Sequence, residues 1–219
     1  MENFDELART WDNDPMRAER AKTVAEAILK TIPSHPSMDA FEYGCGTGLL
    51  SLNLQPYFHT ITLGDSSQGM LKVLEEKIER AGLTNLRPVQ MDLTKDDPIP
   101  AQRFDLIYTL LTLHHIKDLD KVFHAFAVML KPLGWLCIAD LDEEDGSFHG
   151  PDFSGHNGFN RNELAEQLVG YGFGDIRMMT CYENIKRSQD GAVSKYPMFL
   201  LVGQKKKGER PEHIGKTIK

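Results

Sequence analysis

The chain reads Phe41-Glu42-Tyr43-Gly44-Cys45-Gly46-Thr47-Gly48-Leu49-Leu50 at residues 41–50, and this stretch decides the fold. A short apolar run ends in an acid, three alternating glycines follow, and an apolar helical pattern then resumes. This order predicts a strand, a tight loop and the start of a helix. Glycine is needed where the backbone adopts a positive φ or lies against a ligand, and an ordinary turn uses fewer glycines. The stretch therefore predicts a loop that binds a nucleotide-type cofactor.

The spacing of the glycines narrows the kind of ligand. A dinucleotide fingerprint has the form G-x-G-x-x-G, whereas here the third glycine falls one residue early and Leu49 stands where that pattern has glycine. This spacing disfavours a pyrophosphate. No lysine follows the glycines, so the G-K-[ST] sequence of a P-loop is also absent. The ligand that remains has a nucleoside but no phosphates.

Apolar periodicity and turn residues predict the elements around this loop. Helices are expected at residues 15–32, 49–58, 68–81, 118–130 and 160–169, with Asn160 as a cap. Strands are expected at residues 38–43, 60–64, 86–91, 104–113, 135–141, 176–182 and 197–203. Residues 104–113 are almost continuously apolar, as in a central parallel strand covered on both faces, and Asp105 near its start is expected to be structural.

An acid follows the second expected strand. Asp65 lies about twenty residues after the first glycine, where nucleoside-binding folds place a carboxylate against the ribose hydroxyls. A carboxylate offers two acceptors to two neighbouring donors. The alternative is that Asp65 caps the helix that begins near Ser66 and Ser67.

The acid-x-G-x-G-x-G form resembles motif I of the class I S-adenosylmethionine (SAM) dependent methyltransferases, in their small-molecule, type 11 branch. The resemblance covers residues 4–204 and continues in order through four further segments: Gln68-Gly69-Met70-Leu71, Met91-Asp92-Leu93, His114-His115-Ile116 and Lys131-Pro132-Leu133-Gly134. It implies a single-domain Rossmann-like α/β fold with a seven-stranded, mostly parallel sheet, helices on both faces and a closing antiparallel strand. The methyltransferase domain is expected at residues 1–204, with an N-terminal helical cap at 1–33 and a disordered basic tail at 205–219.

The resemblance also implies where SAM binds. Met70 and Leu93 are expected to sandwich the adenine, and the Asp92 carboxylate is expected to accept from its exocyclic amine. The alternative for Asp92 is a turn acid that precedes Asp96-Asp97-Pro98. The full set of expected cofactor-binding residues is Glu42, Gly44, Cys45, Gly46, Gly48, Asp65, Ser66, Met70, Asp92, Leu93 and Leu110.

The acceptor side is expected in segments that carry less of the family pattern. The polar loop at residues 142–160 follows the fifth strand, at the carboxyl edge of the sheet where α/β folds bind ligands. His149, His156 and His115 are the candidate catalytic residues. Loop histidines are also commonly solvated, and one member of the His114-His115 pair is alternatively buried and hydrogen-bonded. No metal is expected, because no further His or Cys stands near the pair at helical ligand spacing.

The N-terminal segment has two interpretations. Phe4, Leu7 and Trp11 lie three and four residues apart, on one face of a possible helix. This pattern fits a short helix packed on the domain. The Phe-Asp-x-x-Ala-x-x-Trp-Asp sequence also resembles a segment that covers the cofactor or substrate pocket in many small-molecule methyltransferases.

Composition limits the partners and the compartment. The 219 residues are 41% apolar and 26% charged, with a formal net charge of −7, which gives no overall attraction to nucleic acid or to an anionic membrane. Cys45, Cys137 and Cys181 lie in or beside apolar runs, as reduced thiols of a cytoplasmic protein do. No apolar run approaches the ~20 residues of a membrane span. We expect a cytoplasmic protein with a small-molecule acceptor.

The expected function is methyl transfer from SAM by in-line displacement, with S-adenosylhomocysteine as the product. The sulfonium already activates the methyl group, so the protein has mainly to align the acceptor and exclude water. Two alternatives stay open. A SAM-binding partner or regulatory subunit would keep the cofactor residues without an acceptor pocket, and another nucleoside-cofactor enzyme would bind a different ligand. The acceptor and the oligomeric state do not follow from these residues.

Overall fold

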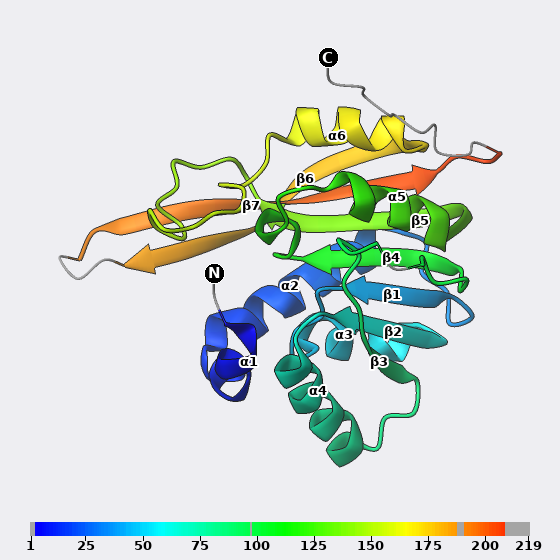
Figure 1. Cartoon of the computed structure of the whole chain (residues 1–219), viewed down its shortest axis with the longest axis horizontal. Coiled ribbons are helices and arrows are strands. Elements are labelled where there is room, and N and C mark those ends of the chain that lie inside the picture. Colours follow the sequence, from blue (N-terminus) through cyan, green and yellow to red (C-terminus); the bar gives the residue numbers. More distant parts are fainter. Residues whose placement is uncertain (1–2, 97, 188–190, 209–219) are drawn as a thin grey trace.

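A seven-stranded sheet with helices on both faces forms the protein, as the sequence predicts (Figure 1). The computed structural model describes residues 3–96, 98–187 and 191–208. The strand order is β3-β2-β1-β4-β5-β7-β6. Among the described strands, β7 runs antiparallel to both of its neighbours, β5 and β6, and the other adjacent pairs are parallel. The strands are β1 (Asp39–Tyr43), β2 (Thr60–Asp65), β3 (Leu86–Gln90), β4 (Phe104–Leu110), β5 (Leu130–Leu141), β6 (Phe173–Arg187) and β7 (Val193–Lys205).

Side-chain caps mark the start of three of the described α-helices, namely α2, α4 and α6. The Ser67 side chain accepts from the Met70 N–H at the start of α4, and Gly82 ends that helix in the left-handed conformation. Asn160 caps α6 through its side chain, also as predicted. The α-helices are α1 (Phe4–Leu7), α2 (Pro15–Thr31), α3 (Leu49–Leu54), α4 (Gln68–Ala81), α5 (Asp120–Met129) and α6 (Arg161–Gly170). Short 3-10 helices are η1 (Ala8–Asn13), η2 (Gln55–Tyr57) and η3 (Leu113–His115).

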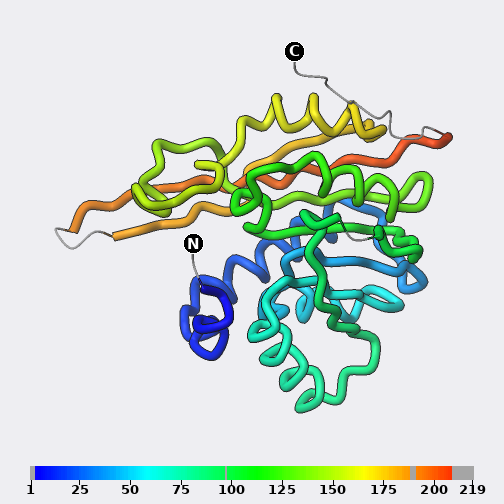
Figure 2. The backbone as a smooth tube through the Cα atoms, in the orientation of Figure 1, coloured from blue at the N-terminus to red at the C-terminus, as the bar shows by residue number. Residues whose placement is uncertain are grey.

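Two apolar layers lie on opposite faces of the sheet. Successive side chains of β4 alternate between them, since Ile107 joins the layer beneath α5 and α6 while Leu106 and Tyr108 join the layer beneath α2 and α3. The side chains on both faces of β4 are fully buried at these three positions, which explains the almost continuous apolar run of this strand. Figure 2 follows the backbone through the helices that connect the parallel strands.

The C-terminal strands are longer than the sequence predicts. β6 and β7 pair from Phe173 with Lys205 to Arg187 with Val193, and Figure 1 shows their far ends extending beyond the other strands. The outer half of β6 is largely exposed, so it lacks the alternation that marks a half-buried strand. β5 also begins earlier than predicted. Its pairing with β4 jumps from Leu130 to Trp135, so the Lys131-Pro132-Leu133-Gly134 segment lies within an irregular part of this strand.

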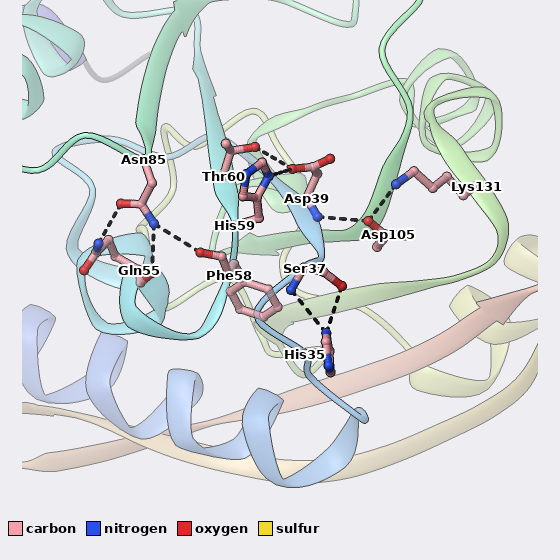
Figure 3. A network of polar contacts seen from close by, with 10 residues as sticks. All are labelled: His35, Ser37, Asp39, Gln55, Phe58, His59, Thr60, Asn85, Asp105 and Lys131. Atoms are coloured by element: carbon pink, nitrogen blue, oxygen red, sulfur yellow. Dashed lines mark hydrogen bonds and ion pairs between the residues drawn. The ribbon is translucent and has the colours of Figure 1, made fainter.

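Polar contacts tie together the edge at which the central strands begin (Figure 3). The Asp39 N–H donates to the Asp105 carboxylate at 2.9 Å, and Lys131 Nζ donates to the same carboxylate at 2.7 Å. The structural role predicted for Asp105 is therefore confirmed. His59 and Thr60 contact the Asp39 carboxylate on the same edge. The opposite, carboxyl edge of the sheet is left for a functional site.

The ends of the chain test the predicted domain limits only in part. β7 continues through Lys205, and the Lys206 N–H donates to the Gly172 carbonyl at 2.9 Å. Most of the expected tail, residues 209–219, lies outside the described residues. Within the described part of the chain, none of the helices has the length and apolar character needed to cross a membrane.

Candidate functional site

The glycine loop lies where the strand order reverses. β1 is followed in sequence by β2 on one side and pairs with β4 on the other, and open α/β sheets bind ligands at such a switch point. Gly44, Gly46 and Gly48 have φ values of 72°, 52° and 81°, which L side chains rarely adopt. The N–H groups of Gly44 and Cys45 donate to the Gly64 carbonyl at 2.8 and 3.1 Å. The loop is therefore anchored to the end of β2.

The three glycines meet different surroundings. A Cβ atom on Gly44 would lie 2.2 Å from the Thr112 side chain, and one on Gly48 would lie 2.4 Å from Leu74 Cδ1. Both glycines are required for packing within the protein. A Cβ atom on Gly46 would meet only Trp11 Nε1, at 4.0 Å. Gly46 therefore has more room beside its Cα atom than the other two glycines, and its expected role in cofactor binding stays a prediction.

The Asp65 side chain joins this loop to the start of α4. Its carboxylate accepts from the Gly46 N–H at 2.7 Å and from the Ser67 N–H at 2.8 Å. Burial raises the pKa of Asp65, while these backbone donors oppose the shift. Ser67, rather than Asp65, is the N-cap residue of α4. Each carboxylate oxygen keeps a further lone pair, so the predicted ribose contact fits the geometry.

Asp92 and Leu93, two of the residues expected around adenine, line an open cavity of about 740 Å³, whereas Met70 is not among its lining residues. Asp92 Oδ1 accepts from the Thr94 N–H at 3.0 Å and from Thr94 Oγ1 at 2.6 Å, so Asp92 makes the turn contact that its alternative role requires. The Leu93 N–H donates to the Tyr43 hydroxyl at 3.2 Å. Met70 is buried at the start of α4, and Leu93 is also buried. The cavity lining includes Ser66, Gln90, Met91, Asp92, Leu93 and Ile99.

Two of the expected cofactor-binding side chains lie beneath the loop. Glu42 is 2% exposed and accepts from the Ser51 hydroxyl, which also contacts the Tyr108 hydroxyl at 2.5 Å. Burial raises the pKa of Glu42 to about 8. Cys45 is also buried, and burial raises the pKa of its thiol. Both side chains contact the protein interior, so their contribution to cofactor binding stays a prediction.

The N-terminal segment lies across the entrance to the loop. Asp5 Oδ1 accepts from Ser67 Oγ at 2.6 Å and from the Gly69 N–H at 2.7 Å. Asp12 Oδ1 accepts from Thr47 Oγ1 at 2.6 Å, which binds η1 to the glycine loop. We call residues 4–13 the lid. These contacts are the arrangement that the pocket-covering interpretation requires.

Three histidines meet beside the lid. His114 and His115 follow β4 in η3, and His149 comes from the loop after β5. The centroid of the His114 ring lies 4.2 Å from the centroid of the His115 ring and 5.0 Å from that of the His149 ring. The Phe4 ring of the lid packs edge-on to His115, with 5.3 Å between centroids. The acceptor-side candidates His115 and His149 are therefore neighbours, next to a segment that also touches the glycine loop.

The environment favours the neutral form of two of these imidazoles, those of His115 and His149. Burial, followed by the neighbouring histidines, lowers the pKa of His115 to about 3. Burial and His114 lower the pKa of His149 to about 4. His114 is 1% exposed, and its Nδ1 donates to the Asp140 carboxylate at 2.6 Å. An acid at the end of β5 thus fixes the orientation of the innermost ring.

His156 does not join this cluster. Its Nε2 donates to the Ile116 carbonyl at 2.9 Å, and its N–H donates to the His114 carbonyl at 2.7 Å. These bonds fasten the loop to the segment after β4. Its predicted catalytic role stays a prediction. Leu110, the last expected cofactor contact, lies half-buried at the end of β4.

The comparisons with known proteins agree with this geometry. A family model described as a methyltransferase domain matches residues 41–138. An uncharacterised methyltransferase of Schizosaccharomyces pombe is 30% identical over 178 residues, which are 77% of this chain and 60% of that protein. Residues 41–138 therefore match the methyltransferase-domain family, and the chain is similar to a protein named as a methyltransferase over most of its length.

Other similar proteins share the name or the fold of this methyltransferase family. A ubiquinone biosynthesis O-methyltransferase of Coxiella burnetii is 28% identical over 64% of this chain and 60% of its own length. The chain thus spans about 60% of the length of these curated relatives. The crystal structure of a SAM-dependent methyltransferase from Clostridium acetobutylicum superposes with a TM-score of 0.66 at 19% identity, covering 94% of this chain and all of that one.

Several residues of this methyltransferase site escape sequence reasoning. Asp140 ends an apolar strand and gives no pattern of its own, although it orients His114. Gly69 stands inside α4, where a Cβ atom would lie 2.8 Å from the Asp5 backbone, so the lid can approach only a glycine. A lone glycine within a helical pattern is the signal that could have found it. Tyr43 carries no motif, yet its hydroxyl receives the Leu93 N–H.

Proposed function

We propose that the protein transfers the methyl group of SAM to a small-molecule acceptor. The observation that carries the proposal is the space left by the missing side chain of Gly46, where a Cβ atom would meet only Trp11 Nε1 at 4.0 Å and whose N–H donates to the Asp65 carboxylate. A nucleoside bound in this space would contact the backbone of the glycine loop, and its two ribose hydroxyls would donate to the Asp65 carboxylate. The match to the methyltransferase-domain family and the SAM-dependent structural neighbour support SAM rather than a dinucleotide.

The residues of this chain would hold SAM through three contacts. Asp65 would accept from the ribose hydroxyls, and Asp92 Oδ2, which lies 3.6 Å from Lys95 Nζ, would accept from the adenine amine. The Gly46 backbone leaves room for the part of SAM between the ribose and the sulfonium. SAM supplies an electrophilic methyl carbon, whose bond to sulfur breaks as the acceptor atom bonds to it, with the electron pair passing to sulfur.

The lid and the histidines would then act on the acceptor. The lid excludes water from the space above the loop. An unprotonated nitrogen of His115 or His149 can take the proton that a hydroxyl, thiol or amine acceptor loses on methylation. The low pKa values keep both rings in the accepting form at neutral pH. An acceptor that loses its proton readily needs little help from such weak bases.

Calorimetry tests the cofactor directly. The full chain is titrated separately with SAM, S-adenosylhomocysteine, decarboxylated SAM and NAD. Binding of SAM and S-adenosylhomocysteine, with weaker binding of decarboxylated SAM and none of NAD, supports the proposal. Preference for NAD or for decarboxylated SAM contradicts it.

The acceptor is sought with SAM labelled isotopically in the methyl group and with fractionated metabolites. Transfer of label to a small molecule distinguishes an enzyme from a SAM-binding partner protein. The Gly46→Val variant is expected to transfer no label, because it is expected not to bind SAM. Labelling by this variant at the wild-type rate would contradict the assignment of the site.

A further inference from the structure

The histidine cluster has an unusual hydrogen-bonding balance. His114 is almost completely buried, yet its Nε2 has no hydrogen-bond partner among the described residues. His149 Nε2 is likewise buried and without a partner there. Burying a polar atom without a hydrogen-bond partner destabilises the folded protein, because the atom gives up its hydrogen bonds to water. Such atoms therefore need an explanation. Two of them face one cluster.

The tautomer of His114 leaves a lone pair for a ligand. Its Nδ1 lies 2.6 Å from Asp140 Oδ1, and the Asp140 carboxylate also accepts from the N–H groups of Leu113 and Leu141. A carboxylate only accepts, so the neutral tautomer of His114 that fits this contact carries its proton on Nδ1 and its lone pair on Nε2. Metal-binding histidines commonly donate their second N–H to a carboxylate, which orients the ring. His114 and Asp140 make this arrangement.

The ring nitrogens of the three histidines also lie close to one another. One ring nitrogen from each of His114, His115 and His149 lies within 4.8 Å of the others. Three nitrogens bound to one tetrahedral zinc ion are about 3.3 Å apart, so closing the cluster needs only small rotations of the rings. The His149 ring is held by Phe153, which stacks on it with 4.0 Å between centroids and 17° between planes.

We propose that His114, His115 and His149 bind a divalent transition-metal ion of the zinc type. Neutral imidazoles suit this class of ion, and three protein nitrogens leave a fourth position for water or for an anionic oxygen or sulfur ligand. The sequence predicts no metal here, since it offers no third ligand near the His114-His115 pair. The fold supplies that ligand from the loop after β5. Occupancy would replace proton acceptance by these rings with polarisation of a bound ligand.

The test measures metal binding alone, without SAM or an acceptor. The full chain, freed of any histidine tag and treated with chelator, is titrated with Zn²⁺ and with Co²⁺ by calorimetry and by visible absorption of bound cobalt. Wild type is expected to bind one ion per chain. The His149→Phe variant keeps a ring that can stack on Phe153, and His115→Ala changes a half-buried residue of η3, so both are expected to fold.

Each of these variants is expected to lose at least tenfold in affinity, because removing a ligand costs at least as much as the 10–100-fold loss from changing its hydrogen-bonded partner. The matched control is His59→Ala, whose exposed ring lies at the opposite edge of the sheet (Figure 3) and which is expected to bind as wild type does. Asp140→Asn is expected to weaken binding without removing a ligand.

Two results overturn the proposal. One is the absence of saturable binding of either ion by wild type. The other is unchanged affinity in folded His149→Phe or His115→Ala protein, as judged by circular dichroism. Because the assay contains no SAM, failure here leaves the proposed methyl transfer standing, and failure to bind SAM leaves the metal site standing.

Discussion

The buried Glu42 carboxyl is expected to make the stability of the protein fall as pH rises. Glu42 is 2% exposed, and burial raises its pKa from 4.5 in the unfolded chain to about 8 in the folded protein. Between these values the folded state holds a proton that the unfolded state has released. The free energy of unfolding therefore decreases by about 1.4 kcal/mol per pH unit in this window, and by about 5 kcal/mol across it.

The Glu42→Gln variant isolates this contribution. Glutamine resembles the protonated carboxyl in shape and does not titrate, so the two proteins are expected to have similar stability near pH 5. Above pH 5 wild type is expected to lose stability relative to the variant, up to about pH 8, where the carboxyl ionises in both states. Urea unfolding of both proteins at one-unit steps from pH 5 to pH 8 measures the difference.

The control is Glu75→Gln on α4, which changes an exposed carboxylate. Its stability profile is expected to run parallel to that of wild type. Parallel profiles for wild type and Glu42→Gln would refute the reasoning, because they would show that the folded and unfolded chains bind the Glu42 proton equally. A profile that diverges in the opposite direction would show that Glu42 is ionised in the folded protein.

Four further substitutions test the cofactor half of the site. Asp65→Ala is expected to weaken SAM binding by about 1–3 kcal/mol in calorimetry, since ribose hydroxyls lose their acceptor. It is also expected to lower stability, because the N–H groups of Gly46 and Ser67 lose the same acceptor. Gly46→Val is expected to abolish SAM binding in a folded protein, whereas Gly48→Ala meets Leu74 and is expected to cost about 1–3 kcal/mol in unfolding experiments. Gly69→Ala is expected to speed SAM dissociation in stopped-flow measurements, because the added Cβ displaces the lid from α4. Alanine favours a helix more than glycine does, so the substitution is not expected to unfold α4 itself. Wild-type SAM behaviour in folded Asp65, Gly46 or Gly69 variants would contradict the corresponding role.

Local signals explain how much of the fold the sequence predicts. The bounds of α4 are predicted correctly, because a capping serine, strong apolar periodicity and a terminal glycine all agree at Ser67 and Gly82. The ends of β6 and β7 are missed. Their outer residues stabilise the hairpin by pairing with each other, and backbone pairing of exposed residues leaves no apolar alternation to detect.

The same distinction applies to the site. The glycine loop and Asp65 can be predicted because backbone geometry and a fixed spacing limit which residues fit. The contact between His149 and the His114-His115 pair cannot, since it depends on how an aperiodic loop folds back over η3. Asp140 is missed for a related reason. Its function is set by the ring that it orients, and nothing in an apolar strand indicates that partner.

The switch point of the sheet divides the site into two halves that are mechanically joined. Loops after β1, β2 and β3 carry the proposed cofactor contacts, and loops after β4 and β5 carry the histidine cluster. Thr112 lies between the halves, with its side chain 2.2 Å from the position of a Cβ atom on Gly44 and two residues before His114. A side chain at Gly44 would therefore push the segment that holds His114 as well as the loop. A substitution at Gly44 is therefore expected to disturb both halves, whereas one at Gly46, whose Cβ would meet only Trp11 Nε1 at 4.0 Å, is expected to affect the proposed cofactor contacts alone.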